Sequence, residues 1–304
     1  MPNLVSVVVT FRNEEEVLPV LVERVSKVFA DIDYDFELLL IDDSSTDKSA
    51  TIFAEMHKRD PRVKGVTTSR RFGVYVCMLG GLRLASGDCA IYLDCDLQDP
   101  PELIPKMLDA WRGGADIVNM RRTRRLGESW FHVFVVKFAY RVIHLSSAVE
   151  IPIDVGDFKL YSRRALDHLC AMGESYPYIR GLAAWIGFNQ SILEYERLPR
   201  LAGESKRGGI SKAALRVFSN AILSFSGAPI YAVGLLGIAG LIVSISGLIA
   251  TLALNADWRE TALATSGLIL SVILLSNFVL GLYIYRIWQE VLQRPTFIIK
   301  DRLL

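Results

Sequence analysis

Two long stretches without a charged residue constrain the fold of this chain most. Residues 228–254 form 27 consecutive uncharged positions, and residues 262–285 form another 24. At a helical rise of about 1.5 Å per residue, each stretch is long enough to cross a hydrocarbon core about 30 Å thick. Soluble helices of this length carry a charged face, which argues against a pair of buried core helices. We therefore predict two transmembrane helices, joined tightly by residues 255–261.

The net charge of +1 conceals two parts of opposite sign within the 304 residues. Up to Glu204 the chain has 25 Lys and Arg against 29 Asp and Glu, and after it 9 against 4, so the parts carry −4 and +5. A hydrophobic content of 51% excludes a disordered chain, and 22% charged residues exclude a protein lying wholly in lipid. We expect a catalytic domain at residues 1–210, an amphipathic helix at 211–227, and a membrane domain with a short tail at 228–304.

Charges around the two stretches predict their orientation. Basic residues gather on the outer flanks: Lys206, Arg207, Lys212, Arg216, Arg286, Arg294, Lys300 and Arg302. The connection between the stretches has one arginine against two acidic residues. By the positive-inside rule, both termini and the first domain lie in the cytoplasm. Since the N-terminus also lacks the features of a signal peptide, we expect a multi-pass protein of the cell (inner) membrane.

The first half of the chain alternates between strand and helix patterns. Buried-strand runs occur at residues 4–11, 36–41, 63–67, 89–93 and 117–120, and helical spacing occurs at residues 14–30, 49–59, 74–85 and 101–113. This alternation predicts an α/β fold with a mostly parallel sheet. The cysteines, Cys77, Cys89, Cys95 and Cys170, form no CxxC pair and are expected to be reduced core residues.

Two segments have the pattern of helices at an interface. Residues 129–149 are aromatic and apolar but interrupted by Lys137 and Arg141, so a helix on the membrane surface and a helix packed on the sheet are equally good interpretations. Residues 211–226 are amphipathic and lead into the first apolar stretch. Glycines at 234, 237 and 240 would allow close helix packing, which leaves a homo-oligomer open.

Acidic residues stand where two of the predicted strands end. Asp42 and Asp43 follow one strand, and Asp94 and Asp96 follow another. Ligands of parallel sheets bind beyond the carboxyl ends of the strands, and a pair of carboxylates there suits Mg²⁺ or Mn²⁺ held together with substrate phosphates. The chain has no GxGxxG after its first strand and no GxxxxGK[ST], which argues against a dinucleotide oxidoreductase and a P-loop nucleotidase. The pattern indicates a nucleotide diphosphate site.

Several motifs together resemble one known family. They are Asn13-Glu14-Glu15, the stretch 41–47, the stretch 94–102, Gly156-Asp157-Phe158-Lys159-Leu160, Ile179-Arg180-Gly181-Leu182 and Gly203-Glu204-Ser205-Lys206. The chain resembles the GT-A, family 2 glycosyltransferases over nearly its whole length, in the polyprenyl-phosphate branch that includes bactoprenol glucosyltransferases and dolichol-phosphate mannose synthases. The resemblance implies a Rossmann-like GT-A domain followed by amphipathic helices and two transmembrane helices, and a hexosyltransferase activity.

The resemblance also implies roles for individual residues. Nucleotide-sugar binding falls to Asn13, Glu14, Asp42, Asp43, Asp94 and Gln98, and the metal, Mg²⁺ or Mn²⁺, to Asp94 and Asp96. The acceptor phosphate falls to Arg122, Arg125, Arg180 and Lys206, and the catalytic set is Asp157, Asp96, Arg122 and Arg125. Asp157 would orient the phosphate or stabilise positive charge on the sugar, with general base as the lesser role. Each of these residues also has a plainer interpretation. Arg122 and Arg125 could lie in a solvated charged loop, Asp157 could cap a turn, and Lys206 could serve only as a signal for membrane topology.

These observations lead to one main functional hypothesis. The chain is expected to transfer a glucose-like hexose from a UDP-sugar to undecaprenyl or another polyprenyl phosphate, with inversion and with a divalent metal, at the cytoplasmic membrane face. Arg71, Val74 and Tyr75 depart from the family pattern near the donor, so GDP-mannose is an alternative donor. A processive synthase is disfavoured because the chain has no QxxRW motif. A catalytically silent lipid-binding scaffold is the alternative from another class, and no nucleic-acid partner is expected.

Overall fold

The strands of the sheet are runs of aliphatic and β-branched residues. The computed structural model describes residues 3–123, 152, 155–174, 177–198, 228–254 and 258–304. The strands are β1 (Leu4–Phe11), β2 (Asp35–Asp42), β3 (Val63–Thr68), β4 (Cys89–Asp94), β5 (Ile117–Arg122), β6 (Val155–Ser162), β7 (Gln190–Tyr195) and β8 (Ile299–Leu303). The helices are α1 (Leu18–Ala30), α2 (Ser49–Arg59), α3 (Val74–Leu84), η1 (Pro101–Leu103, a 3₁₀ turn), α4 (Ile104–Arg112), α6 (Arg163–Ala171), α7 (Ile179–Trp185), α9 (Ala228–Leu254) and α10 (Trp258–Val291).

The sheet has eight strands in the order β7-β5-β6-β4-β1-β2-β3-β8. Neighbouring strands are parallel except where β6 pairs with β4 and β5 and where β8 pairs with β3. The prediction of a mostly parallel sheet is therefore confirmed. The antiparallel direction of β6 matters for the site, because it brings the first residues of β6 to the sheet edge at which β4 and β5 end.

Helices cover both faces of the sheet. Helices α1, α2 and α4 pack on one face through residues such as Leu21, Phe53 and Met107, and α3, α6 and α7 pack on the other through residues such as Leu79 and Leu166. Each fully buried side chain of this kind contributes about 1.5–3 kcal/mol of hydrophobic free energy. The central strand β1 is buried on both faces, as expected for a parallel sheet between two helical layers.

Predicted boundaries agree closely with the structure, with one instructive difference. Helix α1 begins at Leu18, four residues later than predicted. The Val17 and Leu18 amides both donate to the Glu14 carbonyl at 3.1 Å, so residues 14–17 form a turn. Pro19 lies in the first helical turn, where its missing N–H is not needed. The turn leaves Asn13 and Glu14 in the connection beside the strand ends.

A buried carboxylate at the opposite edge of the sheet has a structural role. Glu37 is 3% exposed and accepts hydrogen bonds from the Ser6 hydroxyl and from the amide and hydroxyl of Ser86, each at 2.7 Å, and it pairs with Lys64 at 3.3 Å. Burial alone would raise its pKa, but these donors outweigh burial and lower the pKa below its usual value. The contacts of Glu37 join β2 to β1, to β3 and to the connection before β4.

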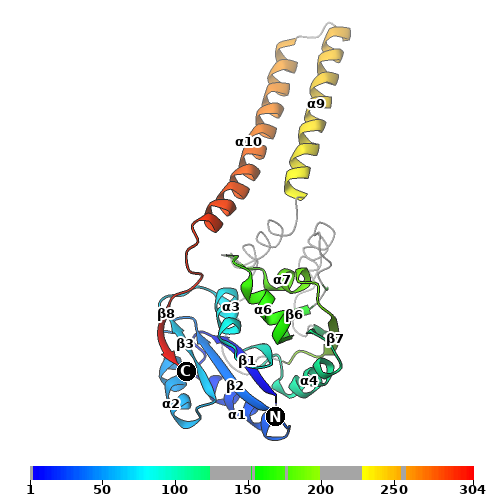
Figure 1. Cartoon of the computed structure of the whole chain (residues 1–304). Coiled ribbons are helices and arrows are strands. Elements are labelled where there is room, and N and C mark those ends of the chain that lie inside the picture. Colours follow the sequence, from blue (N-terminus) through cyan, green and yellow to red (C-terminus); the bar gives the residue numbers. More distant parts are fainter. Residues whose placement is uncertain (1–2, 124–151, 153–154, 175–176, 199–227, 255–257) are drawn as a thin grey trace.

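Two long apolar helices extend side by side from the domain (Figure 1). The spans Pro229–Thr251 and Thr265–Val291 have mean hydropathies of 2.3 and 2.2. Only 6% and 0% of the most apolar stretch of each span is buried inside the protein. Such exposure distinguishes them from core helices of a soluble domain. Helix α10 continues to Val291, six residues past the predicted end of the span at residue 285. Gly237 and Gly240 lie toward Val272 of α10, so these glycines serve the contact within the hairpin.

The residues after α10 return to the sheet instead of forming a free tail. Strand β8 lies antiparallel to β3, with Gly65 opposite Leu303 and Thr68 opposite Ile299 (Figure 1). It covers what would otherwise be an edge strand with unpaired backbone groups. Since β8 follows α10 in the chain, a strand that comes after the hairpin belongs to the same sheet as strands that come before it.

Candidate active site

Side chains from five strands form a row at one edge of the sheet. In spatial order they come from β7 (Tyr195), β5 (Arg122), β6 (Asp157), β4 (Asp94) and β2 (Asp42). Strand β1 separates the last two, since Thr10 lies opposite Asp94 and Phe11 opposite Asp42. Two strand spacings place the ends of β2 and β4 about 10 Å apart. The row is therefore long enough to contact several parts of one extended ligand.

The connections that follow three of these strands have unusual backbone conformations. Asn13, Ser44 and Leu97 have φ angles of 55°, 57° and 56°, in the left-handed region. They follow β1, β2 and β4 respectively. Non-glycine residues enter this region at a cost of about 1–3 kcal/mol, and such residues cluster at functional sites. Their concentration at one edge of the sheet marks that edge as the candidate site.

The end of β4 is the most negative part of the row. The Thr10 hydroxyl is 2.8 Å from the Tyr92 hydroxyl, which donates to Asp94 at 3.2 Å. Asp96 accepts the Gln98 amide at 3.2 Å. Burial, followed by the charges of the other nearby aspartates, raises the pKa of Asp94 to about 7. A cation bound here would relieve the repulsion among these carboxylates.

Two arginines lie on the other side of the Asp96 loop. Asp99, fully buried, accepts a hydrogen bond from the Tyr195 hydroxyl and lies 3.6 Å from an Nη of Arg122. Arg197 spans two carboxylates, at 3.8 Å from Asp99 and 4.0 Å from Asp96. Both arginine side chains are mostly buried, with 17% and 14% of their surface exposed. Asp99 thus brings two cations to the carboxylates of β4.

The guanidinium of Arg122 rests against the backbone of β6. A Cβ at Gly156 would lie 2.8 Å from Nη2 and 3.0 Å from Cζ of Arg122, closer than side-chain atoms normally approach. The Nε of Arg122 donates to the Tyr195 hydroxyl at 3.1 Å. Gly156, Tyr195 and Asp99 therefore fix Arg122 from three sides.

Asp157 is held as a carboxylate by basic neighbours. Both of its oxygens accept hydrogen bonds from Arg180 of α7, at 2.7 Å each. Burial alone would raise the pKa of Asp157, but Arg180, Lys159 and Arg122 outweigh it and lower the pKa below its usual range. Lys159 of the same strand is 2% exposed, and burial lowers its pKa to about 7. A carboxylate in this state is a poor proton acceptor.

The end of β2 has a different arrangement. Asp42 accepts the amide and hydroxyl of Ser45 through Oδ1 at 2.8 and 2.6 Å, while its buried Oδ2 accepts no hydrogen bond from the residues that the structure describes. Burial raises the pKa of Asp42. The oxygens of Asp43 accept the backbone amides of Phe72 and Gly73, at 2.6 and 3.0 Å. Asp43 thus binds the connection between β3 and α3 directly.

Asn13 and Glu14 join the connections after β1 and β2. The Asn13 side chain accepts the Thr46 amide at 2.8 Å and donates to the Thr46 hydroxyl at 3.1 Å, and the Glu14 amide donates to Ser49 at 2.9 Å. Gln98 donates from its side chain to the Leu198 carbonyl at 3.3 Å. These contacts order the loops on which the carboxylates stand.

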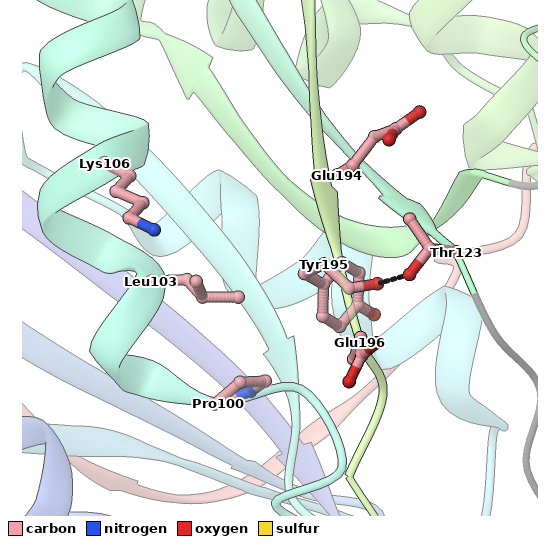
Figure 2. A pocket seen from close by; sticks show the side chains of 7 residues that line it. All are labelled: Pro100, Leu103, Lys106, Thr123, Glu194, Tyr195 and Glu196. Carbon is pink, nitrogen blue, oxygen red and sulfur yellow. Dashed lines mark hydrogen bonds between the residues drawn. The ribbon is translucent and has the colours of Figure 1, made fainter.

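A cavity of about 400 Å³ adjoins the row at Tyr195 (Figure 2). Its lining comes from α4, the preceding turn and the end of β7: Pro100, Leu103, Lys106, Thr123, Glu194, Tyr195 and Glu196. It shares only Tyr195 with the row of charged groups. We therefore place the candidate site at the row, where the paired carboxylates and the arginines lie, and not in this cavity.

The structure brings together most of the residues predicted from the sequence. Asp94, Asp96, Asp157, Arg122 and Arg180 lie at the same end of the sheet, where Arg122 is linked to Asp96 through Asp99 and Arg197, and Arg180 pairs with Asp157. Arg125 and Lys206 lie outside the described residues, as do the segments 129–149 and 211–226. Sequence analysis did not single out Asp99, Tyr195 or Arg197. Asp99 falls within the motif at 94–102, which gave a signal for it, whereas Tyr195 ends an ordinary strand and Arg197 follows it, with no motif around them.

Comparison with known proteins agrees with this geometry. The family model "Glycosyl transferase family 2" matches residues 6–170. The chain belongs to glycosyl transferase family 2. It is 36% identical to the glycosyltransferase YkcC of Bacillus subtilis (strain 168), covering 97% of this chain and 93% of that protein. It is 34% identical to the SfII prophage-derived bactoprenol glucosyl transferase of Shigella flexneri, covering 97% of both.

A solved structure supports the fold of this family 2 glycosyltransferase. Glucosyl-3-phosphoglycerate synthase from Mycobacterium tuberculosis, in complex with Mn²⁺, UDP and phosphoglyceric acid, matches 73% of this chain and 78% of that chain, with a TM-score of 0.52 and 19% identity. The GT-A fold class expected from the sequence is therefore confirmed. The family match and the relatives named as glycosyltransferases confirm the expected hexosyltransferase class.

Proposed function

We propose that this family 2 enzyme transfers a glucose-like hexose from a UDP-sugar to a polyprenyl phosphate, with inversion at the anomeric carbon. The observation that carries the proposal is the row itself, in which aspartates stand at the ends of β2 and β4, and Asp96, Asp99 and Asp157 hold arginines from β5, α7 and the segment after β7 at the same edge. Carboxylates suit a metal and a nucleoside, and arginines suit phosphates. The row provides both within a single site.

A divalent cation, Mg²⁺ or Mn²⁺, fits the end of β4. Asp94 and Asp96 would hold it, and the raised pKa of Asp94 supports a need for positive charge there. Within the part of the chain that the structure describes, no group of three or more His, Cys, Asp or Glu side chains forms a complete metal site. The donor diphosphate would therefore complete the coordination, as is usual for Mg²⁺. When bound, the metal would supply charge stabilisation to the departing diphosphate.

The arginines can offset the electrostatic repulsion between the donor diphosphate and the acceptor phosphate. Two unit charges 4 Å apart repel by about 4 kcal/mol at an effective dielectric constant near 20. Arg122 and Arg197 approach the carboxylates of β4, and Arg180 adjoins Asp157, so cations flank the place where two phosphates would meet. We propose that Arg122 and Arg180, with Arg125 and Lys206, bind the acceptor phosphate.

The chemistry requires no strong base. An oxygen of the lipid phosphate, already anionic, forms the new bond to the anomeric carbon, and the bond from that carbon to the UDP oxygen breaks with its electron pair leaving on UDP. The lowered pKa of Asp157 and its two bonds to Arg180 support a role in orienting that arginine. General-base catalysis by Asp157 is correspondingly disfavoured.

The donor end of the row suits a nucleoside. The buried Oδ2 of Asp42, which has no hydrogen-bond partner in the described part of the chain, is available to accept a hydrogen bond from a base or ribose, while Asn13, Glu14 and Asp43 order the loops beside it. The glucosyl-3-phosphoglycerate synthase structure contains UDP and Mn²⁺ on a related fold, and the Shigella flexneri relative is named as a bactoprenol glucosyl transferase. These names support UDP-glucose and a polyprenyl phosphate as the substrates to test first.

The structure also supports placement at a membrane. Helices α9 and α10 are long, apolar and exposed, and α3, α6 and α7 lie on the side of the sheet from which they extend (Figure 1). Trp185, at the end of α7, is 62% exposed, as is common for tryptophan at a membrane interface. Because β8 rejoins the sheet, two crossings would leave both flanking segments on one side. We propose that this side is the cytoplasm.

The test is synthesis of the lipid-linked sugar. The full chain in detergent is incubated with undecaprenyl phosphate, Mn²⁺ and either UDP-glucose, UDP-galactose or GDP-mannose, and lipid products are identified by mass and anomeric configuration. We expect a hexosyl lipid from UDP-glucose with inverted configuration, and no product in EDTA. A product formed only with GDP-mannose would show that GDP-mannose, and not a UDP-sugar, is the donor. No product with any donor would refute the proposal.

Paired variants test the site. Asp96→Asn should abolish transfer, because it removes a carboxylate from the end of β4. Asp109→Asn is the matched control, since Asp109 is exposed on α4 away from the row. Normal turnover by Asp96→Asn would exclude Asp96 from the catalytic set.

A further inference from the structure

The segment after α10 contacts β3, the residue after β3 and helix α3, next to the donor end of the row. We call residues 296–303 the C-terminal strap. Its strand β8 pairs with β3, and the pairing is interrupted between Thr67 and Thr68, where β3 approaches its end. In Figure 1 the strap runs from the base of α10 along the edge of the sheet beside β3. The strap thus connects the membrane hairpin with the strand that leads into the β3–α3 loop, residues 69–73.

The β3–α3 loop is held from three sides. The Ser69 amide donates to the Ile298 carbonyl of the strap at 2.9 Å. The Thr68 hydroxyl donates to the carbonyls of Asp42 and Arg70, at 3.1 and 2.9 Å. From the far side, Asp43 accepts the amides at the end of the loop. Because Asp43 binds the loop and the Asp42 carbonyl binds Thr68 just before it, the position of the loop is linked to the end of β2.

The strap also fixes the helix that follows the loop. The ring of Phe297 packs on Gly80 of α3, so closely that a Cβ at Gly80 would lie 2.7 Å from two of the ring carbons. Arg83 of α3 lies 3.4 Å from the Thr296 hydroxyl. The strap therefore touches the strand before the loop, the loop itself and the helix after it.

A contact at the base of α10 ties the strap to the hairpin. Arg286 of α10 lies 3.8 Å from Glu174, which follows α6 in the catalytic domain, and 3.9 Å from Glu290. Only seven residues separate Val291, the end of α10, from Ile299, the start of β8. With both ends of this short connection attached to the domain, the strap has little freedom to leave β3.

We propose that the C-terminal strap positions the β3–α3 loop for nucleotide-sugar binding. The strap, by way of Ile298 and Phe297, holds the loop against Asp42 and Asp43, so donor affinity depends on residues that follow the membrane hairpin. This inference rests on the proposed function, in which that end of the row binds the nucleoside. Phe297 and Gly80 are positioning residues, since neither belongs to the row of charged groups.

The contact between Phe297 and Gly80 offers a precise perturbation. Carbon atoms normally pack about 3.5–4.0 Å apart, so Gly80→Ala pushes the ring away by about 1 Å. Alanine forms helices better than glycine, so the same change does not weaken α3 itself. Phe297→Ala removes the ring, and Gly80→Ala combined with Phe297→Ala restores the space. Lys300→Ala is the control, because Lys300 is exposed in the same strap.

The assay separates donor binding from transfer. With UDP-glucose and Mn²⁺, we expect Gly80→Ala and Phe297→Ala each to raise the donor KM about fivefold while kcat changes less than about twofold. The double variant should be no worse than Phe297→Ala alone, because both act through the same ring. Lys300→Ala should match the unaltered enzyme. Additive effects, or an unchanged KM in both single variants, would overturn the inference.

Amide hydrogen exchange without nucleotide provides an independent readout. Exchange in residues 68–73 should accelerate in both single variants and stay unchanged in Lys300→Ala. Should Gly80→Ala not fold, Phe297→Ala alone decides the result. If the unaltered enzyme binds no UDP-glucose, the proposed function fails, yet exchange still tests whether the strap orders the loop. Unchanged exchange in Phe297→Ala would refute that ordering.

Discussion

Gly156→Ala should displace Arg122 without altering any charged group. The added Cβ would lie 2.8 Å from Nη2 and 3.0 Å from Cζ of the guanidinium. Ordinary packing distances of about 3.5–4.0 Å require the guanidinium to retreat by about 0.7–1 Å. This movement would disturb the hydrogen bond that Nε donates to the Tyr195 hydroxyl, now 3.1 Å long.

The size of the effect follows from this displacement. A misplacement of about 1 Å in a positioning group reduces a rate by up to about 100-fold. We therefore expect kcat/KM for sugar transfer to fall about 30- to 100-fold. Overpacking a well-packed site typically lowers the free energy of unfolding by about 1–3 kcal/mol, so the variant should remain folded.

The assay measures transfer from UDP-glucose to undecaprenyl phosphate together with thermal unfolding. Gly173→Ala is the control, because an added Cβ there meets nothing within 4 Å. Arg122→Ala and its combination with Gly156→Ala test the mechanism. If Gly156 acts through Arg122, its substitution has no further effect once Arg122 is absent. A full additional loss in that background, or normal transfer by Gly156→Ala, would refute the reasoning.

Two further predictions concern buried carboxylates. Asp157→Asn removes the ionised group that pairs with Arg180, so it should lower the free energy of unfolding by about 3–5 kcal/mol and also lower the transfer rate. Denaturant unfolding measures the first effect and transfer kinetics the second. An unchanged free energy of unfolding would contradict the prediction. Glu37 has a lowered pKa, so its contribution to stability is present above its unfolded pKa near 4.5 and is lost as the pH falls through the folded pKa. Unfolding measured between pH 6 and pH 3 should therefore show a smaller decline in Glu37→Gln than in the unaltered protein, and identical pH profiles would exclude this role.

The first half of the fold was predictable because its signals are local. Strands β1 to β5 are short apolar runs separated by helical periodicity, and parallel strands place their carboxyl ends at one edge. That rule alone predicted that the acidic residues after β2 and β4 would meet. The start of α1 differed because a turn at Glu14 satisfies the same backbone groups as a first helical turn would.

The remaining parts of the site depend on long-range pairing. Asp157 stands near the start of its strand, and it reaches the site only because β6 runs antiparallel to its neighbours. Tyr195 and Arg197 reach Asp99 because β7 pairs with β5, a pairing that no local pattern specifies. The strap is harder still to predict, since five residues with mixed polarity carry little strand signal. The family resemblance identified Asp157 and Arg180 as site residues, but their mutual pairing came from the structure.

Strand β8 has a consequence for the order in which the protein is made. About 230 residues separate Thr68 from Ile299, so at about 5–20 residues per second β3 waits about 10–50 s for its partner during synthesis. Both apolar helices leave the ribosome within that interval. The sheet is therefore completed only after the hairpin has been made, and a chain that stops in the hairpin keeps an unpaired edge at β3. An unpaired edge strand can pair with other chains and aggregate. The catalytic domain therefore loses this exposed edge only in chains whose two apolar helices have already been made.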